Sequence, residues 1–128
     1  MKVYYLRFSL NLLSGLICLL CIPQNTNAIV TSSELQALTD TYYSMNGPNW
    51  DRRAYWLSGD PCTAPWAGIT CTGGSVTYIW LDNNNIVGSF PNSVGGLKYL
   101  TGISFNNNLI TGNMIYIFNL FSTSVSSM

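Results

Sequence analysis

The sequence contains no histidine, and charged residues make up only 8% of its 128 residues. No pair of carboxylates stands at a spacing that would support glycosidase chemistry, and no Ser or Thr has a recognisable activating base. Phosphate-binding motifs are also missing, since neither Gly73-Gly74 nor Gly95-Gly96 is followed by Lys and then Ser or Thr. We therefore expect a protein that is not an enzyme and that needs no cofactor.

Basic residues are too few to form a patch. Beyond residue 28 the chain has three basic and five acidic residues, a net charge of −2. Because nucleic-acid-binding proteins present clustered Lys and Arg to phosphates, no nucleic-acid partner is expected. The Asn-x-Ser/Thr acceptor for glycosylation is absent as well, which supports neither an extracellular nor an intracellular address.

The first 28 residues have the layout of a secretory signal peptide. Lys2 and Arg7 give a basic start, an uncharged, mostly apolar run follows from Phe8 to Ile22, and Pro23 ends it. This run of 15 residues is shorter than the roughly 20 of a membrane-spanning helix. We expect removal of residues 1–28 and no membrane span afterwards, with an uncleaved membrane anchor as the alternative.

Four cysteines would become two after this cleavage. Cys18 and Cys21 lie in the apolar run, so Cys62 and Cys71 remain. Zinc normally needs about four ligands, and neither histidine nor further cysteine is present. An exported chain with two cysteines is expected to form one disulfide, worth about 2.5 to 3 kcal/mol for so short a loop.

Residues 31–47 predict one helix. Thr31 and Glu34 have capping-box spacing, and Asn46-Gly47-Pro48 is a strong stop in which Gly47 suits a left-handed cap. The apolar residues at helical spacing predict one narrow buried face: Leu35, Leu38, Tyr42 and Met45.

The segment 49–73 is irregular and rich in aromatic residues. It contains Trp50, Tyr55, Trp56 and Trp66, and Cys62 and Cys71 enclose its second half. Large aromatic side chains usually serve burial, which favours a small core beneath the disulfide loop. The alternative is an aromatic platform for a ligand.

Residues 76–99 and 100–123 align as a repeat with a constant offset of 24. Six positions match, and they are Val76 with Leu100, Ile79 with Ile103, Leu81 with Phe105, Asn84 with Asn108, Ile86 with Ile110, and Gly88 with Gly112. A period in the twenties with this spacing of apolar residues and asparagine is typical of leucine-rich repeats.

The alternation around Ile79 and Leu81 predicts a strand with one face inward. At its end an inward asparagine can satisfy turning backbone groups, because its amide both donates and accepts hydrogen bonds. We therefore expect Asn84 and Asn108 to form a structural ladder, and Asn83, Asn85 and Asn107 to occupy solvent-facing or turn positions.

The mature chain resembles the N-terminal region of plant-type leucine-rich repeat proteins. Their capping element appears here as Asp60-Pro61-Cys62 through Trp66-x-Gly68-x-x-Cys71, and their convex-side motif as Gly88, Phe90, Pro91, Val94, Gly95 and Leu97. The resemblance implies an α/β fold: the start of a leucine-rich-repeat solenoid behind a helical, disulfide-closed cap. The implied organisation is a signal peptide (1–28), a cap (29–73), one full and one partial repeat (74–112), and a divergent apolar, Ser-rich tail (113–128).

The pattern breaks after Gly112, where Ile115 replaces the expected proline. Solenoid repeats need neighbours to bury their faces, and about three or more are needed for stability. We therefore expect the chain to be a truncated piece of a longer protein. The alternative is a naturally short protein in which the aromatic tail serves as an improvised cap.

Binding is the function class that remains. Outward strand residues line the concave side of a solenoid, here Thr77, Tyr78, Trp80, Asp82, Asn83, Thr101, Ser104, Asn106 and Asn107. As ligand-binding residues we predict Tyr78, Trp80, Asp82, Asn83, Ser104 and Asn106. Trp80 either anchors a partner or packs on Tyr78 along the strand.

The resulting hypothesis is a recognition module that binds a protein, peptide or glycan. It would be secreted or lie at the extracellular face of the plasma membrane, as the N-terminal fragment of a receptor-like protein. Two alternatives remain: a fragment with a structural role or none, and, by family resemblance alone, an inhibitor of extracellular polysaccharide hydrolases.

Overall fold

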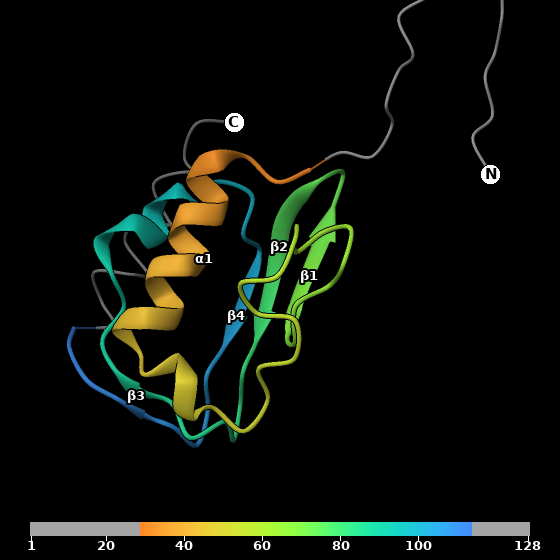
Figure 1. Cartoon of the computed structure of the whole chain (residues 1–128). Coiled ribbons are helices and arrows are strands. Elements are labelled where there is room, and N and C mark those ends of the chain that lie inside the picture. Colours follow the sequence, from red (N-terminus) through yellow and green to blue (C-terminus); the bar gives the residue numbers. More distant parts are fainter. Residues whose placement is uncertain (1–28, 114–128) are drawn as a thin grey trace, which may run out of the picture.

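The computed structural model describes residues 29–113, a mixed helix-and-strand domain with a disulfide that fits the expected α/β class (Figure 1). The predicted signal peptide, with Cys18 and Cys21, lies outside these residues, as does the tail after Asn113. Within the described range the elements are α1 (Ser32–Ser44), η1 (Gly47–Asn49), β1 (Ile69–Thr72), β2 (Ser75–Trp80), β3 (Val87–Gly88), η2 (Asn92–Gly96), β4 (Gly102–Ser104) and β5 (Leu109–Ile110).

The start of α1 confirms the predicted capping box. The Glu34 backbone N–H donates to Thr31 Oγ1 at 3.3 Å, and the Thr31 N–H donates to Glu34 Oε2 at 3.0 Å. The other carboxylate oxygen of Glu34 accepts from the Val76 N–H at 3.0 Å. One buried side chain therefore caps the helix and ties its first turn to β2.

The buried face of α1 differs in part from the prediction. Leu38, Tyr42 and Met45 are buried as expected, but Leu35 remains 38% exposed. Three further positions of α1 also face the core, namely Glu34, Ala37 and Thr41. The buried stripe is therefore centred away from Leu35, which lies at its edge.

The end of α1 also corrects the sequence analysis. The left-handed residue that follows the helix is Asn46, at φ 60°, and not Gly47. Asparagine tolerates this conformation because its short polar side chain can bond locally. Gly47 is needed for a different reason: a Cβ there would overlap the ring of Tyr42.

A three-stranded sheet has the order β1–β2–β4, with β1 antiparallel and β4 parallel to β2, and α1 lies across one face of it (Figure 1). Tyr78 pairs with Gly102 and Trp80 with Ser104, which is the predicted offset of 24. β3 and β5 form a separate parallel pair, and Gly88 of β3 lies close to the C-terminal end of α1.

The alignment predicts a constant offset of 24, but the offset changes along the chain. In the β3–β5 pair Val87 lies opposite Leu109, an offset of 22. Asn85 adopts a left-handed conformation at φ 52°, whereas its counterpart Leu109 already lies in β5. Because the second segment lacks this backbone kink, it reaches the sheet two residues earlier.

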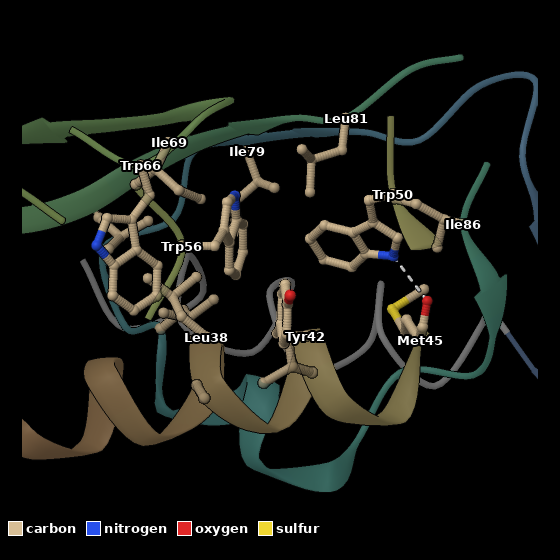
Figure 2. Packing of buried hydrophobic residues seen from close by; sticks show 14 of the residues in the cluster. Leu38, Tyr42, Met45, Trp50, Trp56, Trp66, Ile69, Ile79, Leu81 and Ile86 are labelled. Carbon is tan, nitrogen blue, oxygen red and sulfur yellow. Dashed lines mark hydrogen bonds between the residues drawn. The ribbon is translucent and has the colours of Figure 1, made fainter. Parts of the chain in front are cut away.

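The core lies between α1 and the sheet (Figure 2). Trp50, Trp56 and Trp66 are at most 7% exposed, so these tryptophans form a core and not a ligand platform. Each indole N–H donates to a backbone carbonyl oxygen: Trp50 to Met45 at 2.7 Å, Trp56 to Ala67 at 2.9 Å and Trp66 to Ser58 at 3.0 Å. Tyr55, by contrast, is 67% exposed.

The predicted disulfide is present. Cys62 and Cys71 are joined with a Cα–Cα distance of 5.4 Å, which links the loop after Asp60 to β1. The Asp60 carboxylate adds a second tie, because it accepts hydrogen bonds from the backbone N–H groups of Cys62 and Val30. Together these contacts hold the second half of the aromatic segment to β1 and to Val30 at the start of the domain.

Candidate functional site

Asn84 stands at the turn that follows β2, and its side chain is fully buried. Its Oδ1 accepts from the Arg52 backbone N–H at 2.5 Å, and its Nδ2 donates to the Arg52 carbonyl oxygen at 3.2 Å. One amide thereby satisfies both backbone groups of Arg52, a residue 32 positions earlier in the chain.

Asn108 makes the same kind of contact one segment later. Its Oδ1 accepts from the N–H groups of Asn84 and Ile86 at 2.9 and 3.0 Å, and its Nδ2 donates to the Leu81 oxygen at 2.8 Å. Each of the two asparagines therefore holds the backbone of the segment before it. The residues around Arg52 take the place of such a segment for Asn84, a role that the sequence did not signal.

The neighbouring asparagines have a conformational role. Asn83, Asn85 and Asn107 have φ values of 49°, 52° and 55°, which bulkier side chains rarely adopt. They had been expected at solvent-facing or turn positions, and all three are exposed. The high asparagine content of these turns therefore reflects both a hydrogen-bonding requirement and a backbone requirement.

Tyr78 and Trp80 project from the face of β2 opposite to α1, because the intervening Ile79 points into the core. Their rings lie nearly parallel, with an interplanar angle of 11° and centroids 5.9 Å apart. They remain 38% and 49% exposed, respectively. Trp80 thus packs on Tyr78 and still presents about half of its surface to solvent.

Gly102 permits this arrangement, although sequence reasoning did not single it out. It pairs with Tyr78 across the sheet, and a Cβ at Gly102 would stand 2.6 Å from the Tyr78 ring. The Tyr78 ring therefore leans over the bare backbone of β4. The repeat alignment could have identified Gly102, because it places Gly102 at the position that corresponds to Tyr78.

Asp82, Ser104 and Asn106 are brought together beside this pair. Asp82 Oδ1 accepts from the Ser104 hydroxyl and from the Asn106 backbone N–H, each at 2.6 Å. The Ser104 hydrogen bond lowers the pKa of Asp82 below its ordinary value of 3.8, opposed by burial and aided by Asn106 and by the Arg52 charge. Asp82 is therefore an ionised acceptor that fastens the end of β2 to the segment after β4.

A shallow depression of about 300 Å³ lies next to the aromatic pair, lined by Arg52, Trp80, Asp82 and Asn83. Arg52 reaches it from the segment between η1 and β1, and its guanidinium donates to the Asp82 carbonyl oxygen. Three predicted residues thus line the depression. Of the other predicted residues, Tyr78 stacks on Trp80, whereas Ser104 and Asn106 donate hydrogen bonds to Asp82. Arg52 was missed, because its contact spans 30 residues and no sequence pattern relates Arg52 to Asp82.

The chemistry available at this depression is hydrogen bonding and ring stacking. Within residues 29–113, no cluster of three or more His, Cys, Asp or Glu side chains could hold a metal ion. Over the same residues, no helix has the length and apolarity that a membrane crossing requires.

The chain is similar to plant receptor-like proteins. It is 33% identical to Protein STRUBBELIG-RECEPTOR FAMILY 5 of Arabidopsis thaliana over 66% of the chain and 12% of that protein, and 33% identical to Protein STRUBBELIG-RECEPTOR FAMILY 2 over 80% and 14%. Receptor-like protein kinase HSL1 of the same plant is 34% identical over 46% of the chain and 6% of its own length. No family model matches the chain.

The chain spans about an eighth of the length of the first two relatives. The similarity is therefore to one part of long receptor-like proteins, and it supports no enzymatic activity for this chain.

Proposed function

We propose that the chain is the N-terminal part of a plant-type leucine-rich repeat protein. Two structural features support this: the parallel pairing of β2 with β4 at an offset of 24, and the side-chain amides of Asn84 and Asn108, which each hold the preceding segment. The proposed divisions are a signal peptide (1–28), a cap (29–73), repeats (74–112) and a divergent tail (113–128). The receptor-like relatives support the same assignment.

Its proposed function is non-enzymatic recognition of a protein, peptide or glycan outside the cell. One observation carries this proposal: Trp80 is about half exposed, whereas the other three tryptophans are buried and hydrogen-bonded. Exposing a large aromatic ring forgoes the stabilisation that burial would give, and such rings often anchor partners. The proposed extracellular location is supported by the expected signal peptide, the disulfide and the receptor-like relatives.

The second candidate is a fragment without a competent binding face. It is favoured by the partial exposure of apolar side chains on and after β4, namely Ile103, Phe105 and Ile110. Repeat units bury such residues against the next unit. A monomeric chain with a cooperative thermal transition would support the recognition module, whereas aggregation would support the fragment.

The test of recognition uses the full chain, secreted from plant cells and immobilised. Extracellular fluid of Arabidopsis, divided into protein, peptide and polysaccharide fractions, is passed over the wild type, Trp80→Ala and Tyr43→Ala. Tyr43 is the matched control, an aromatic residue 65% exposed on α1. Retention of one fraction by the wild type and Tyr43→Ala, but not by Trp80→Ala, supports the proposal. Equal retention by all three chains, or by none, contradicts it.

A further inference from the structure

We infer that the depression beside Tyr78 and Trp80 takes a neutral, hydroxyl-rich ligand, that is, an uncharged oligosaccharide. This inference rests on the proposed recognition function and narrows it to one ligand class. It depends on three features of the depression: the exposed aromatic rings, the charge balance of its lining, and the hydrogen bonds that already pair several backbone groups at its border.

The aromatic pair offers apolar surface without a deep pocket. The Trp80 ring lies at the rim of the depression, parallel to the Tyr78 ring, and both are more than a third exposed. A sugar ring has a flat face of C–H groups, which can lie against an aromatic face while its hydroxyls point to the sides. Because Tyr78 leans over Gly102, its ring is already positioned before any ligand arrives.

The polar groups of the lining suit hydroxyls. No hydrogen bond from the Trp80 indole or the Asn83 side-chain amide is found among residues 29–113, so a donor and a donor–acceptor amide remain open to a ligand. The lining also carries one guanidinium, from Arg52, and one carboxylate, from Asp82. These charges cancel, so the lining favours neither an anionic nor a cationic ligand.

An extended peptide fits this depression less well. Peptides that add to a sheet bind through free backbone groups of an edge strand. Here two backbone N–H groups at the border are already paired: the Asn83 N–H donates to the Asn106 oxygen at 2.9 Å, and the Trp80 N–H donates to the Gly68 oxygen at 2.8 Å. The Asp82 oxygen in turn accepts from Arg52.

The experiment titrates the full, secreted, ¹⁵N-labelled chain with three probes of similar length: cellohexaose, which is neutral, hexagalacturonate, which is anionic, and a pool of random hexapeptides. The indole N–H resonance of Trp80, assigned with Trp80→Phe, is the reporter. We expect cellohexaose to shift it saturably and at lower concentration than either other probe. By calorimetry, Trp80→Ala and Tyr78→Ala should weaken binding about tenfold or more, and Tyr43→Ala should change it by less than about twofold.

A larger response to hexagalacturonate or to the peptides would overturn the assignment of the ligand class. It would leave the recognition proposal standing, because the Trp80 face would still bind a ligand. If no probe shifted the Trp80 resonance, the glycan inference would fail. The recognition proposal is decided separately, by the retention of extracellular fractions on the wild type and Trp80→Ala.

Discussion

The molecule holds its tryptophans in two environments on opposite faces of one sheet. On the α1 side, Trp50, Trp56 and Trp66 pack in close succession, with ring centroids 4.9 and 5.1 Å apart, and every indole N–H has a carbonyl partner. On the other side, Trp80 stacks on Tyr78 alone and is 49% exposed.

The difference indicates a separate role for each group of aromatic rings. The buried rings fill the space between a single helix and a small sheet, so folding depends on them. The exposed pair adds surface on the opposite face, and its contribution to folding should be small. Mutations that act on one environment and not on the other can therefore separate stability from binding.

The largest effect is expected for Trp50→Ala, since Trp50 is 1% exposed and contacts both Tyr42 and Trp56. Removal of this ring leaves a cavity and strands the Met45 carbonyl oxygen, which should lower the free energy of unfolding by about 4 kcal/mol. Urea unfolding followed by far-ultraviolet circular dichroism measures the loss. A loss below about 1 kcal/mol would show that the core does not depend on this ring.

The next largest effect is expected for Asn84→Ala. It would remove a fully buried amide and leave the N–H and C=O groups of Arg52 without their partner, at a cost of about 2 to 3 kcal/mol. The matched control is Asn92→Ala, at an exposed position at the start of η2, which should change stability by less than about 0.5 kcal/mol. Equal losses for the two variants would remove the ladder role of Asn84.

Much of the fold could be predicted because its signals are local or periodic. The capping box of α1 needs only Thr31 and Glu34, and the 24-residue repeat places Ile79 beside Ile103. The burial of Trp50, Trp56 and Trp66 was predicted from the large size of aromatic side chains. These features depend on residue type and spacing, which a sequence shows directly.

The missed features depend on the path of irregular chain. Tyr55 and Leu57 adopt left-handed conformations, at φ 65° and 63°, although bulky side chains disfavour them. No local sequence pattern predicts this path of the backbone, and this segment brings Arg52 to the depression. The shift to an offset of 22 at Leu109 likewise depends on a backbone kink present at Asn85 and absent from its counterpart.

A smaller effect is expected for Trp66→Phe, which keeps an aromatic ring but removes the N–H that donates to the Ser58 oxygen at 3.0 Å. We expect a loss of about 1 to 2 kcal/mol, from the unpaired carbonyl and the smaller ring. Trp80→Phe is the matched comparison, because no indole hydrogen bond is lost among the described residues, and it should fall within about 0.5 kcal/mol of the wild type. Similar losses for both would mean that the two environments do not differ in hydrogen bonding.

A still smaller effect on stability than for Trp66→Phe is expected for Trp80→Ala, although it is the variant with the largest expected effect on binding. It removes one stacking contact, with Tyr78, and opens no cavity in the core, so the free energy of unfolding should change by less than about 1 kcal/mol. Urea unfolding and the retention assay on the same preparation measure the two effects together. If Trp80→Ala instead lost more than about 2 kcal/mol, Trp80 would be a structural residue like Trp50. The exposed ring would then no longer argue for a ligand, because its position would be explained by folding alone.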